Sequence, residues 1–224
     1  AGVIVRNLLY GDALDSTMSY RDGKNQLVRV EVDATDFYEE LVDFLSVILT
    51  KDMTPYERVT AIHNAITTSF RYDTESYDEE KGRYDLESYS AKGLFENGVG
   101  VCEGYAELFE TLCLMAGVPC TSVTGSFRGQ NHMWNMVKLD GVWYHVDVTS
   151  DDPVPDQGDK IIDTYFLRSD EFMNESHTWK EGIWPEAPQD YSVVEQETKE
   201  PAESEKEEKG DSANGEKSKE ETAG

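Results

Sequence analysis

The sequence predicts an α+β fold in which helices pack on an antiparallel sheet. Apolar residues recur at helical spacing between residues 37 and 70, and again between residues 103 and 116. Later in the chain, two strand-like runs flank the dipeptide Asp140-Gly141, a strong hairpin signal. Helices and strands that occupy separate stretches of a chain are typical of the α+β class.

The first 33 residues contain two short strand-like runs, 16–20 and 27–32. They flank the turn dipeptide Asp22-Gly23 and are expected to pair as a hairpin. We therefore interpret residues 1–33 as a strand-rich N-terminal extension.

Two helices are predicted next. The first has Asp36 as its expected cap and an apolar face formed by Phe37, Leu41, Phe44, Leu45 and Ile48. The second begins at a capping box, with Thr54 as the cap, Pro55 in the first turn and Glu57 three residues after the cap. Its apolar stripe is Val59, Ile62, Ile66 and Phe70. His63 shares this stripe, which favours a packed, hydrogen-bonded histidine over a catalytic one. Residues 71–87 are polar and rich in tyrosine, so a loop is expected there.

Cys102 stands at the start of a third helix, after the flexible segment Gly98-Val99-Gly100-Val101. Residues 103–116 form a buried helical pattern that Gly117 and Pro119 stop. The unpaired N–H groups and the dipole of a helix N-terminus stabilise a thiolate and also bind an oxyanion. Cys113 and Cys120 lack this setting and are predicted to be buried free thiols. Cys102 is therefore the candidate nucleophile.

The predicted hairpin supplies a base and an acid. If Asp140-Gly141 is a two-residue turn, paired positions sum to 281, and His132 becomes a diagonal neighbour of Asp147 on one face. A carboxylate beside an imidazole fixes its tautomer and stabilises the imidazolium, as a Cys–His nucleophile requires. Trp134 and Trp143 share that face. His145 shares it as well and is the competing base, but it lies nearer the turn.

Three segments of the sequence resemble, in order and spacing, the boxes of the transglutaminase-like superfamily as found in bacterial proteins. They are Gly100–Ala106, His132–Asn135 and Trp143–Thr149, and Tyr165–Asp170 followed by His177-Thr178-Trp179 resembles the closing segment of those proteins. The resemblance covers about residues 54–180. It implies a papain-like core, a nucleophile at Cys102, a general base at His132 and an orienting acid at Asp147. Ser150 stands where an aromatic is expected, which affects the shape of the substrate groove.

The resemblance and the triad together predict a thiol enzyme that acts on protein or peptide amide bonds through an acyl-enzyme. Hydrolysis by a cysteine peptidase or amidase is favoured over transamidation of protein glutamine. A non-catalytic surface binding module with the same fold is the alternative from another class. Specificity is expected to depend on loops 71–97 and 150–163.

No cofactor and no metal are expected. Five acids follow the third box (Asp151, Asp152, Asp156, Asp159 and Asp163), but they lack the spacing of a calcium loop. The cysteines do not form the pairs of a zinc site.

The charge of the chain limits its partners. A formal net charge of −26 disfavours nucleic acid and anionic membranes, because binding to either depends on Lys and Arg. No apolar stretch approaches the ~18 residues that span a bilayer. We therefore expect a monomer with a protein or peptide substrate, no nucleic-acid partner and no membrane insertion. A chain that starts at Ala1 and carries an acidic tail is expected to be extracellular or at the cell surface.

The C-terminal segment differs from the rest in composition. Residues 195–224 hold 11 acidic residues and 5 lysines, and their apolar residues are three alanines and one proline. Such a segment cannot bury enough surface to offset the entropy lost on ordering. We expect residues 191–224 to form a disordered acidic tail, more simply a solvated linker than an interaction tail. The catalytic domain is then residues 34–190.

Overall fold

The computed structural model describes residues 17–21, 27–31, 35–77, 79–80 and 84–192. Strands β1 (Thr17–Arg21) and β2 (Leu27–Glu31) pair antiparallel, which confirms the first predicted hairpin. The turn of that hairpin, the rest of the N-terminal extension and residues 193–224 of the expected tail lie outside the described residues. None of the helices described is long and apolar enough to cross a membrane.

The two predicted N-terminal helices are present as α2 (Thr35–Ile48) and α3 (Pro55–Ser69). Asp36 lies inside the first turn of α2, so its prediction as a cap was wrong. The capping box of α3 is confirmed: Thr54 Oγ1 accepts the Glu57 N–H at 3.3 Å, and Glu57 Oε2 accepts the Thr54 N–H at 2.7 Å. The apolar residues predicted for α3 are buried.

The stretch expected to be loop contains short elements that lead to Cys102. These are β3 (Arg71–Tyr72), the 3-10 helix η1 (Leu86–Tyr89), α4 (Ala91–Asn97) and β4 (Val99–Gly100). β3 pairs in parallel with β4, with Tyr72 opposite Gly100. The expectation of loop throughout 71–87 was therefore wrong at Arg71–Tyr72 and at Leu86–Glu87, and a two-residue strand is too short to leave a pattern in the sequence.

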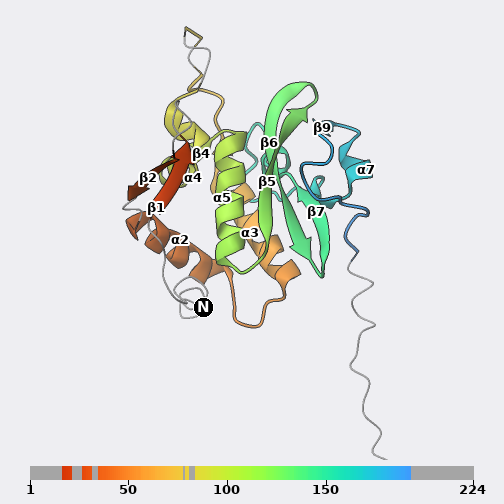
Figure 1. Ribbon diagram of the computed structural model, residues 1–224. Coiled ribbons are helices and arrows are strands. Elements are labelled where there is room, and N and C mark those ends of the chain that lie inside the picture. Colours follow the sequence, from red (N-terminus) through yellow and green to blue (C-terminus); the bar gives the residue numbers. More distant parts are fainter. Residues whose placement is uncertain (1–16, 22–26, 32–34, 78, 81–83, 193–224) are drawn as a thin grey trace, which may run out of the picture. The chain divides into compact units, whose positions relative to one another are not determined.

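Helix α5 (Cys102–Met115) crosses the domain beside the sheet (Figure 1). It begins at Cys102, as predicted, and ends before Gly117, which adopts a left-handed conformation (φ 77°). Gly104 permits a close approach in the first turn, because a Cβ there would lie 2.9 Å from the carbonyl oxygen of Ser88. The start of α5 is thereby held against the segment that precedes α4.

The sheet has the strand order β8-β7-β6-β5-β9, and every neighbouring pair is antiparallel. Its strands are β5 (Cys120–Phe127), β6 (Gln130–Leu139), β7 (Val142–Val146), β8 (Phe166–Arg168) and β9 (His177–Trp179). The short helices α6 (Val148–Asp151) and α7 (Asp170–Met173) lie in the connections. This arrangement of helices and antiparallel strands confirms the α+β class.

The predicted register of the β6–β7 hairpin is confirmed. Leu139 pairs with Val142 and Asn135 with Val146, so paired positions sum to 281. Asp140 (φ 50°) and Gly141 (φ 89°) both have the positive φ of a type I′ turn. The ladder is shorter than predicted, however, since β7 ends at Val146, and Asp147 caps α6 instead of continuing the strand.

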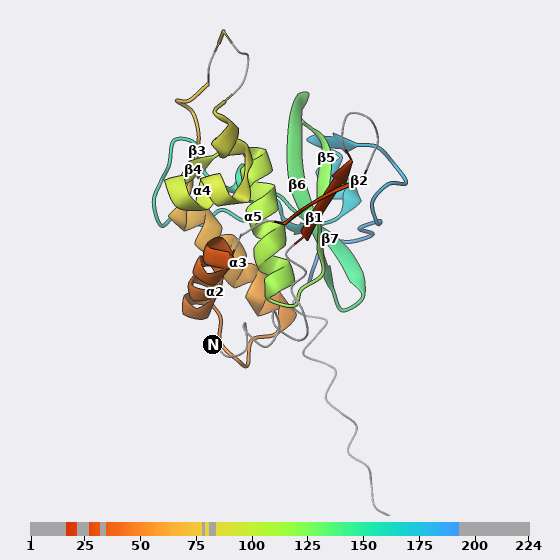
Figure 2. The same cartoon turned by 60° about the vertical axis from the view of Figure 1, so that its left-hand side comes forward.

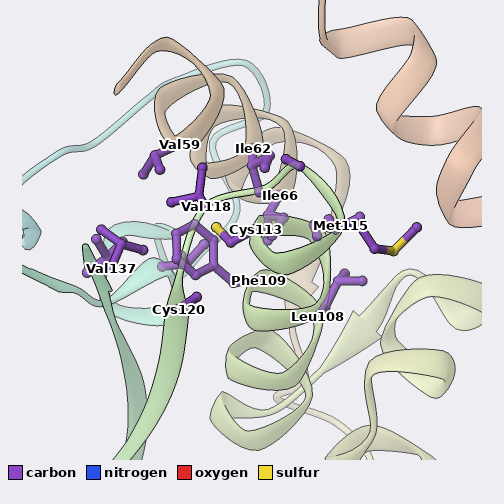
Figure 3. Packing of buried hydrophobic residues seen from close by; sticks show 14 of the residues in the cluster. Val59, Ile62, Ile66, Leu108, Phe109, Cys113, Met115, Val118, Cys120 and Val137 are labelled. Atoms are coloured by element: carbon purple, nitrogen blue, oxygen red, sulfur yellow. The ribbon is translucent and has the colours of Figure 1, made fainter. Parts of the chain in front are cut away.

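The two faces of the sheet pack on different cores. One face contributes Val137, Leu139 and Val146 to the main core, which lies against α2, α3 and α5 (Figure 2). The other face carries Trp134 and Met136 and packs on residues around α7. In the main core, Cys113 lies among Ile62, Ile66, Phe109 and Val118 (Figure 3). Cys113 and Cys120 are both free and buried, as predicted.

Candidate active site

Cys102 is the first residue of α5 and is partly exposed. Its N-cap, Val101, makes no side-chain cap hydrogen bond. The first N–H groups of a helix have no partner within the helix, so those of Cys102 and Glu103 are available to an anion at this point. Cys102 therefore combines a reachable thiol with an electropositive helix end.

His132 and Asp147 form a short hydrogen bond. His132 Nε2 donates to Asp147 Oδ2 at 2.7 Å, and the two side chains are 9% and 0% exposed. Asp147 reaches this position from the cap of α6, where its Oδ1 accepts the Ser150 N–H at 3.0 Å. The β6–β7 ladder runs only as far as Asn135 and Val146, and Thr149 lies in α6, so His132 does not face Thr149 as a longer hairpin would require. The predicted base, on β6, and the predicted acid, which caps α6 directly after the end of β7, are therefore in contact.

His132 also interacts with Cys102, and the two residues line the same cavities. Burial acts to lower the pKa of His132, but the charge of Asp147 and hydrogen bonds to Asp147 and Cys102 raise it to about 10. Because Nε2 is bonded to Asp147, the interaction with Cys102 falls to Nδ1. Burial likewise opposes ionisation of Asp147, yet the charge of His132 and hydrogen bonds from His132, His177 and Ser150 hold the pKa of Asp147 well below its usual range.

His177 is a second histidine on the same carboxylate. Its Nε2 donates to Asp147 Oδ2 at 2.9 Å, and its Nδ1 lies 3.0 Å from Ser176 Oγ. His177 is not among the site residues predicted from the sequence. The one signal for it was the segment His177-Thr178-Trp179, which resembles the closing segment of bacterial transglutaminase-like proteins.

The two other histidines are occupied elsewhere. His145, the competing base, is fully buried; its Nδ1 accepts Trp134 Nε1–H at 2.9 Å, and its Nε2 donates to Asp170 Oδ1 at 2.8 Å. With both nitrogens engaged and its pKa lowered by burial, His145 has no nitrogen left for a thiol. His63 lies 3.1 Å from Asp151 Oδ2 inside the core, as expected of a packed, hydrogen-bonded histidine.

Asn135 connects the strand of His132 to the helix of Cys102. Its Nδ2 donates to the carbonyl oxygen of Ala106 at 3.0 Å and to Ser122 Oγ at 3.2 Å. Asn135 thus makes a buried hydrogen bond from β6 to α5. It fixes the position of β6 along α5, and hence that of His132 relative to Cys102.

Tyr72 is a site residue that the sequence did not reveal. The β3–β4 pair puts it opposite Gly100, two residues before Cys102. Burial raises the pKa of Tyr72, and the charges of Cys102 and Tyr84 and a hydrogen bond with Tyr84 raise it further. Its hydroxyl group is therefore held in the protonated form, and Tyr72 lines the same two cavities as Cys102.

Two cavities meet at Cys102 and His132. One, of about 360 Å³, is lined by Tyr72, Phe127, Arg128, Gln130, Asn131, Thr149, Ser150, Asp152, Pro153, Val154 and Tyr165 in addition to these two residues. The other, of about 810 Å³, carries Tyr77, Tyr84, Tyr89 and Glu103 and shares Tyr72 with the first. Of the two loops predicted to shape the groove, 71–97 contributes to both cavities and 150–163 to the smaller one alone. The turn between β5 and β6 adds a wall to the smaller cavity that was not predicted.

The acids that follow the third box point to different partners. Asp151 pairs with His63, Asp152 accepts the Tyr105 hydroxyl, and Asp156 accepts the Gly158 N–H. Among the described residues, the group with ligand atoms close enough to hold a metal is His132, Asp147 and His177, whose atoms lie within 4.8 Å of one another. The hydrogen bonds within this group account for its geometry.

The chain is similar to proteins of one family. Residues 43–148 match the sequence model of the transglutaminase-like superfamily. The kyphoscoliosis peptidase of Mus musculus is 32% identical over 150 residues, which are 62% of this chain and 20% of the mouse protein. That of Homo sapiens is 34% identical over 131 residues, 53% of this chain and 19% of the human protein. This chain therefore spans about a fifth of the length of these curated relatives.

A solved structure named as a TGase has a TM-score of 0.43 at 20% identity, over 51% of this chain and 31% of that one.

Proposed function

We propose, on the premise that residues 43–148 form a domain of the transglutaminase-like superfamily, that this chain is a thiol enzyme that cleaves amide bonds in polypeptides. The observation that carries the proposal is the position of His132, which bonds to Asp147 through Nε2 at 2.7 Å and lines the same two cavities as Cys102. A cysteine paired in this way with an oriented imidazolium is a competent nucleophile.

The reaction starts with a proton already on His132. The Cys102 thiolate attacks the amide carbonyl and forms a C–S bond, and His132 gives its Nδ1 proton to the leaving amine as the C–N bond breaks. Water then attacks the thioester, with His132 taking its proton. The C–S bond breaks and the acid product leaves. Asp147 stays ionised throughout and stabilises the imidazolium.

The negative oxygen that develops on the carbonyl needs hydrogen-bond donors. The N–H groups of Cys102 and Glu103 at the start of α5 supply one set. Tyr72, a protonated phenol that lines both cavities around Cys102, supplies a second donor when its hydroxyl turns from Tyr84 to the oxyanion. We assign Tyr72 to the stabilisation of this oxyanion.

Hydrolysis is the outcome we favour, with transfer to an amine as the alternative. The same acyl-enzyme serves both. The two relatives at 32% and 34% identity carry the name peptidase, which supports hydrolysis. The two cavities that meet at Cys102, of about 360 and 810 Å³, fit a polypeptide better than a small molecule.

Incubation with casein and a fluorescent primary amine tests the proposal. New peptide fragments indicate hydrolysis, and amine incorporated into intact casein indicates transfer. Both products must disappear in Cys102→Ala and persist in Cys113→Ala, whose sulfur is buried in the core. Turnover that survives in Cys102→Ala would show that the nucleophile is misassigned.

A binding module is distinguished from an enzyme by the reactivity of the thiol. A thiolate paired with an imidazolium reacts with iodoacetamide at pH 6, where a free cysteine is almost fully protonated. We expect Cys102 to be alkylated at pH 6 at least about tenfold faster than free cysteine. A rate equal to that of free cysteine would favour the binding module.

A further inference from the structure

Asp152 is a buried carboxylate on the wall of the catalytic cavity. It is 3% exposed, and it lines the same cavity of about 360 Å³ as Cys102 and His132. Its Oδ2 accepts the hydroxyl of Tyr105. Its Oδ1 has no hydrogen-bond partner. Among the residues that the structure describes, it is the one buried side-chain oxygen or nitrogen atom that lacks a partner.

An unpaired buried carboxylate oxygen is unfavourable in the free protein. Buried charges in proteins are normally paired or hydrogen-bonded on both oxygens. In the described part of the chain, the lysine and arginine ion pairs are Lys92–Glu96 and Arg168–Asp190, so they do not involve Asp152. Arg128 lines the same cavity but is exposed, and its guanidinium lies 4.8 Å from the centre of the Phe127 ring. The described part of the chain therefore provides no hydrogen-bond donor for Asp152 Oδ1.

The surroundings of Asp152 favour a positively charged donor over a neutral one. A neighbouring cavity of about 450 Å³ shares Tyr72, Pro153 and Val154 with the catalytic cavity. Its charged lining is one arginine, Arg71, and five acids: Asp73, Glu75, Asp85, Glu87 and Asp156. Asp156 also acts electrostatically on Asp152. A cation entering from this side meets an excess of negative charge before it reaches Asp152.

We propose that Asp152 is a specificity-determining residue, which binds the ammonium or guanidinium group of a lysine or arginine side chain flanking the amide bond attacked by Cys102. This inference rests on the proposed function, because it names the substrate class of the same thiol site. A neutral side chain in this subsite leaves Asp152 Oδ1 unpaired, so the enzyme discriminates against it. A basic side chain forms a charge-assisted hydrogen bond there.

The first test does not need turnover. Cys102 is modified with three methanethiosulfonate reagents that differ in charge, and the rates are followed by mass spectrometry. The reagents are the positive ethylammonium, the neutral methyl and the negative ethylsulfonate. The ratio of the ethylammonium rate to the methyl rate is expected to fall about fivefold or more in Asp152→Asn. Asp159→Asn is the matched control, because it removes the same charge from an exposed position of the same segment. Its ratio is expected to stay at the wild-type value.

Two outcomes of this test overturn the proposal. An unchanged ratio in Asp152→Asn means that any preference for the cation comes from the overall charge of the protein. Equal slowing of all three reagents means that Asp152 supports the thiol or the fold and not a cation.

The second test uses turnover of casein. Cut sites, or modified sites if the enzyme transfers amines, are identified by mass spectrometry. Lysine and arginine are expected to be enriched within three residues of the sites of the wild-type enzyme, and this enrichment is expected to fall in Asp152→Asn. Cleavage without such enrichment sinks the present inference and leaves the proposed function intact. A protein that turns over no casein but still reacts faster with the cationic reagent at Cys102 would count against the proposed function and leave the cation-binding role of Asp152 intact.

Discussion

His177 Nε2 lies 2.9 Å from Asp147 Oδ2, and neither side chain is exposed. The same oxygen accepts His132 Nε2 at 2.7 Å, so one carboxylate oxygen holds two imidazoles. Asp147 Oδ1 is meanwhile bonded to the Ser150 N–H. His177 therefore restricts where Asp147, and through it His132, can lie. We interpret His177 as a positioning residue of the proposed triad.

Replacing His177 tests that interpretation. His177→Gln keeps an N–H donor near Asp147, whereas His177→Met fills a similar volume without one. We expect kcat to fall about 10- to 100-fold in His177→Met with little change in KM, because a displaced base affects the chemical step more than binding. His177→Gln is expected to recover most of the loss. Equal losses in the two variants, with equal falls in melting temperature, would indicate a role in packing alone.

The sequence was sufficient for the parts of the site that local patterns encode. The type I′ turn at Asp140-Gly141 determines the hairpin register, and the glycines before Cys102 and the stop at Gly117 define α5. Tyr72 and His177 were missed because contacts between distant segments place them. Tyr72 depends on a two-residue parallel pairing with β4, and His177 on a three-residue strand at the edge of the sheet. Neither element is long enough to show a periodicity.

Asp147 is expected to affect rate far more than folding. Asp147→Asn keeps the size of the side chain and an oxygen for the Ser150 N–H, but it removes the charge that stabilises the imidazolium. We expect kcat to fall by roughly 10²–10⁴, as when an orienting carboxylate is lost from a triad. Casein turnover compared with the far-ultraviolet circular dichroism of the two proteins checks this. A variant that folds and retains more than half of the wild-type rate would remove Asp147 from the mechanism.

The pH dependence of kcat/KM reports the protonation of His132 in the free enzyme. In the proposed reaction His132 must carry a proton to release the amine, and its pKa is raised to about 10. Activity is therefore expected to be lost as the pH rises through about 10. In Asp147→Asn, burial still lowers the pKa of His132 while the charge that raised it is gone, so the alkaline limb must move to lower pH. Residual activity with an unmoved alkaline limb would assign that limb to another group.

Tyr72→Phe separates oxyanion stabilisation from nucleophile activation. Loss of the hydroxyl is expected to lower kcat about 10- to 100-fold, somewhat less than the loss of a main donor of an oxyanion hole. KM and the rate of Cys102 alkylation by iodoacetamide are expected to stay within about twofold of wild type, since neither depends on a tetrahedral intermediate. Parallel loss of alkylation and turnover would mean that Tyr72 acts on the thiol.

Asp152 illustrates how a binding group reduces the stability of the protein that carries it. Burial raises the pKa of Asp152 to about 6, despite the hydrogen bond from Tyr105. The folded protein thus holds this proton more tightly than the unfolded chain does. Between about pH 4 and pH 6, the free energy of unfolding contributed by this group falls as the pH rises, because ionisation is easier in the unfolded chain.

Asp152→Asn should therefore be more stable than the wild-type protein at pH 7.5. The amide oxygen of asparagine still accepts the Tyr105 hydroxyl, and the unfavourable buried charge is absent. With about 1.4 kcal/mol per pKa unit, the free energy of unfolding is expected to rise by up to about 3 kcal/mol, which is several degrees in melting temperature for a chain of this size. The difference between the two proteins should shrink toward zero as the pH falls to 4, where the wild-type Asp152 is protonated. Thermal unfolding of both proteins and of Asp159→Asn across this pH range measures it. A variant less stable than wild type at pH 7.5 would mean that the Asp152 charge is already compensated within the protein.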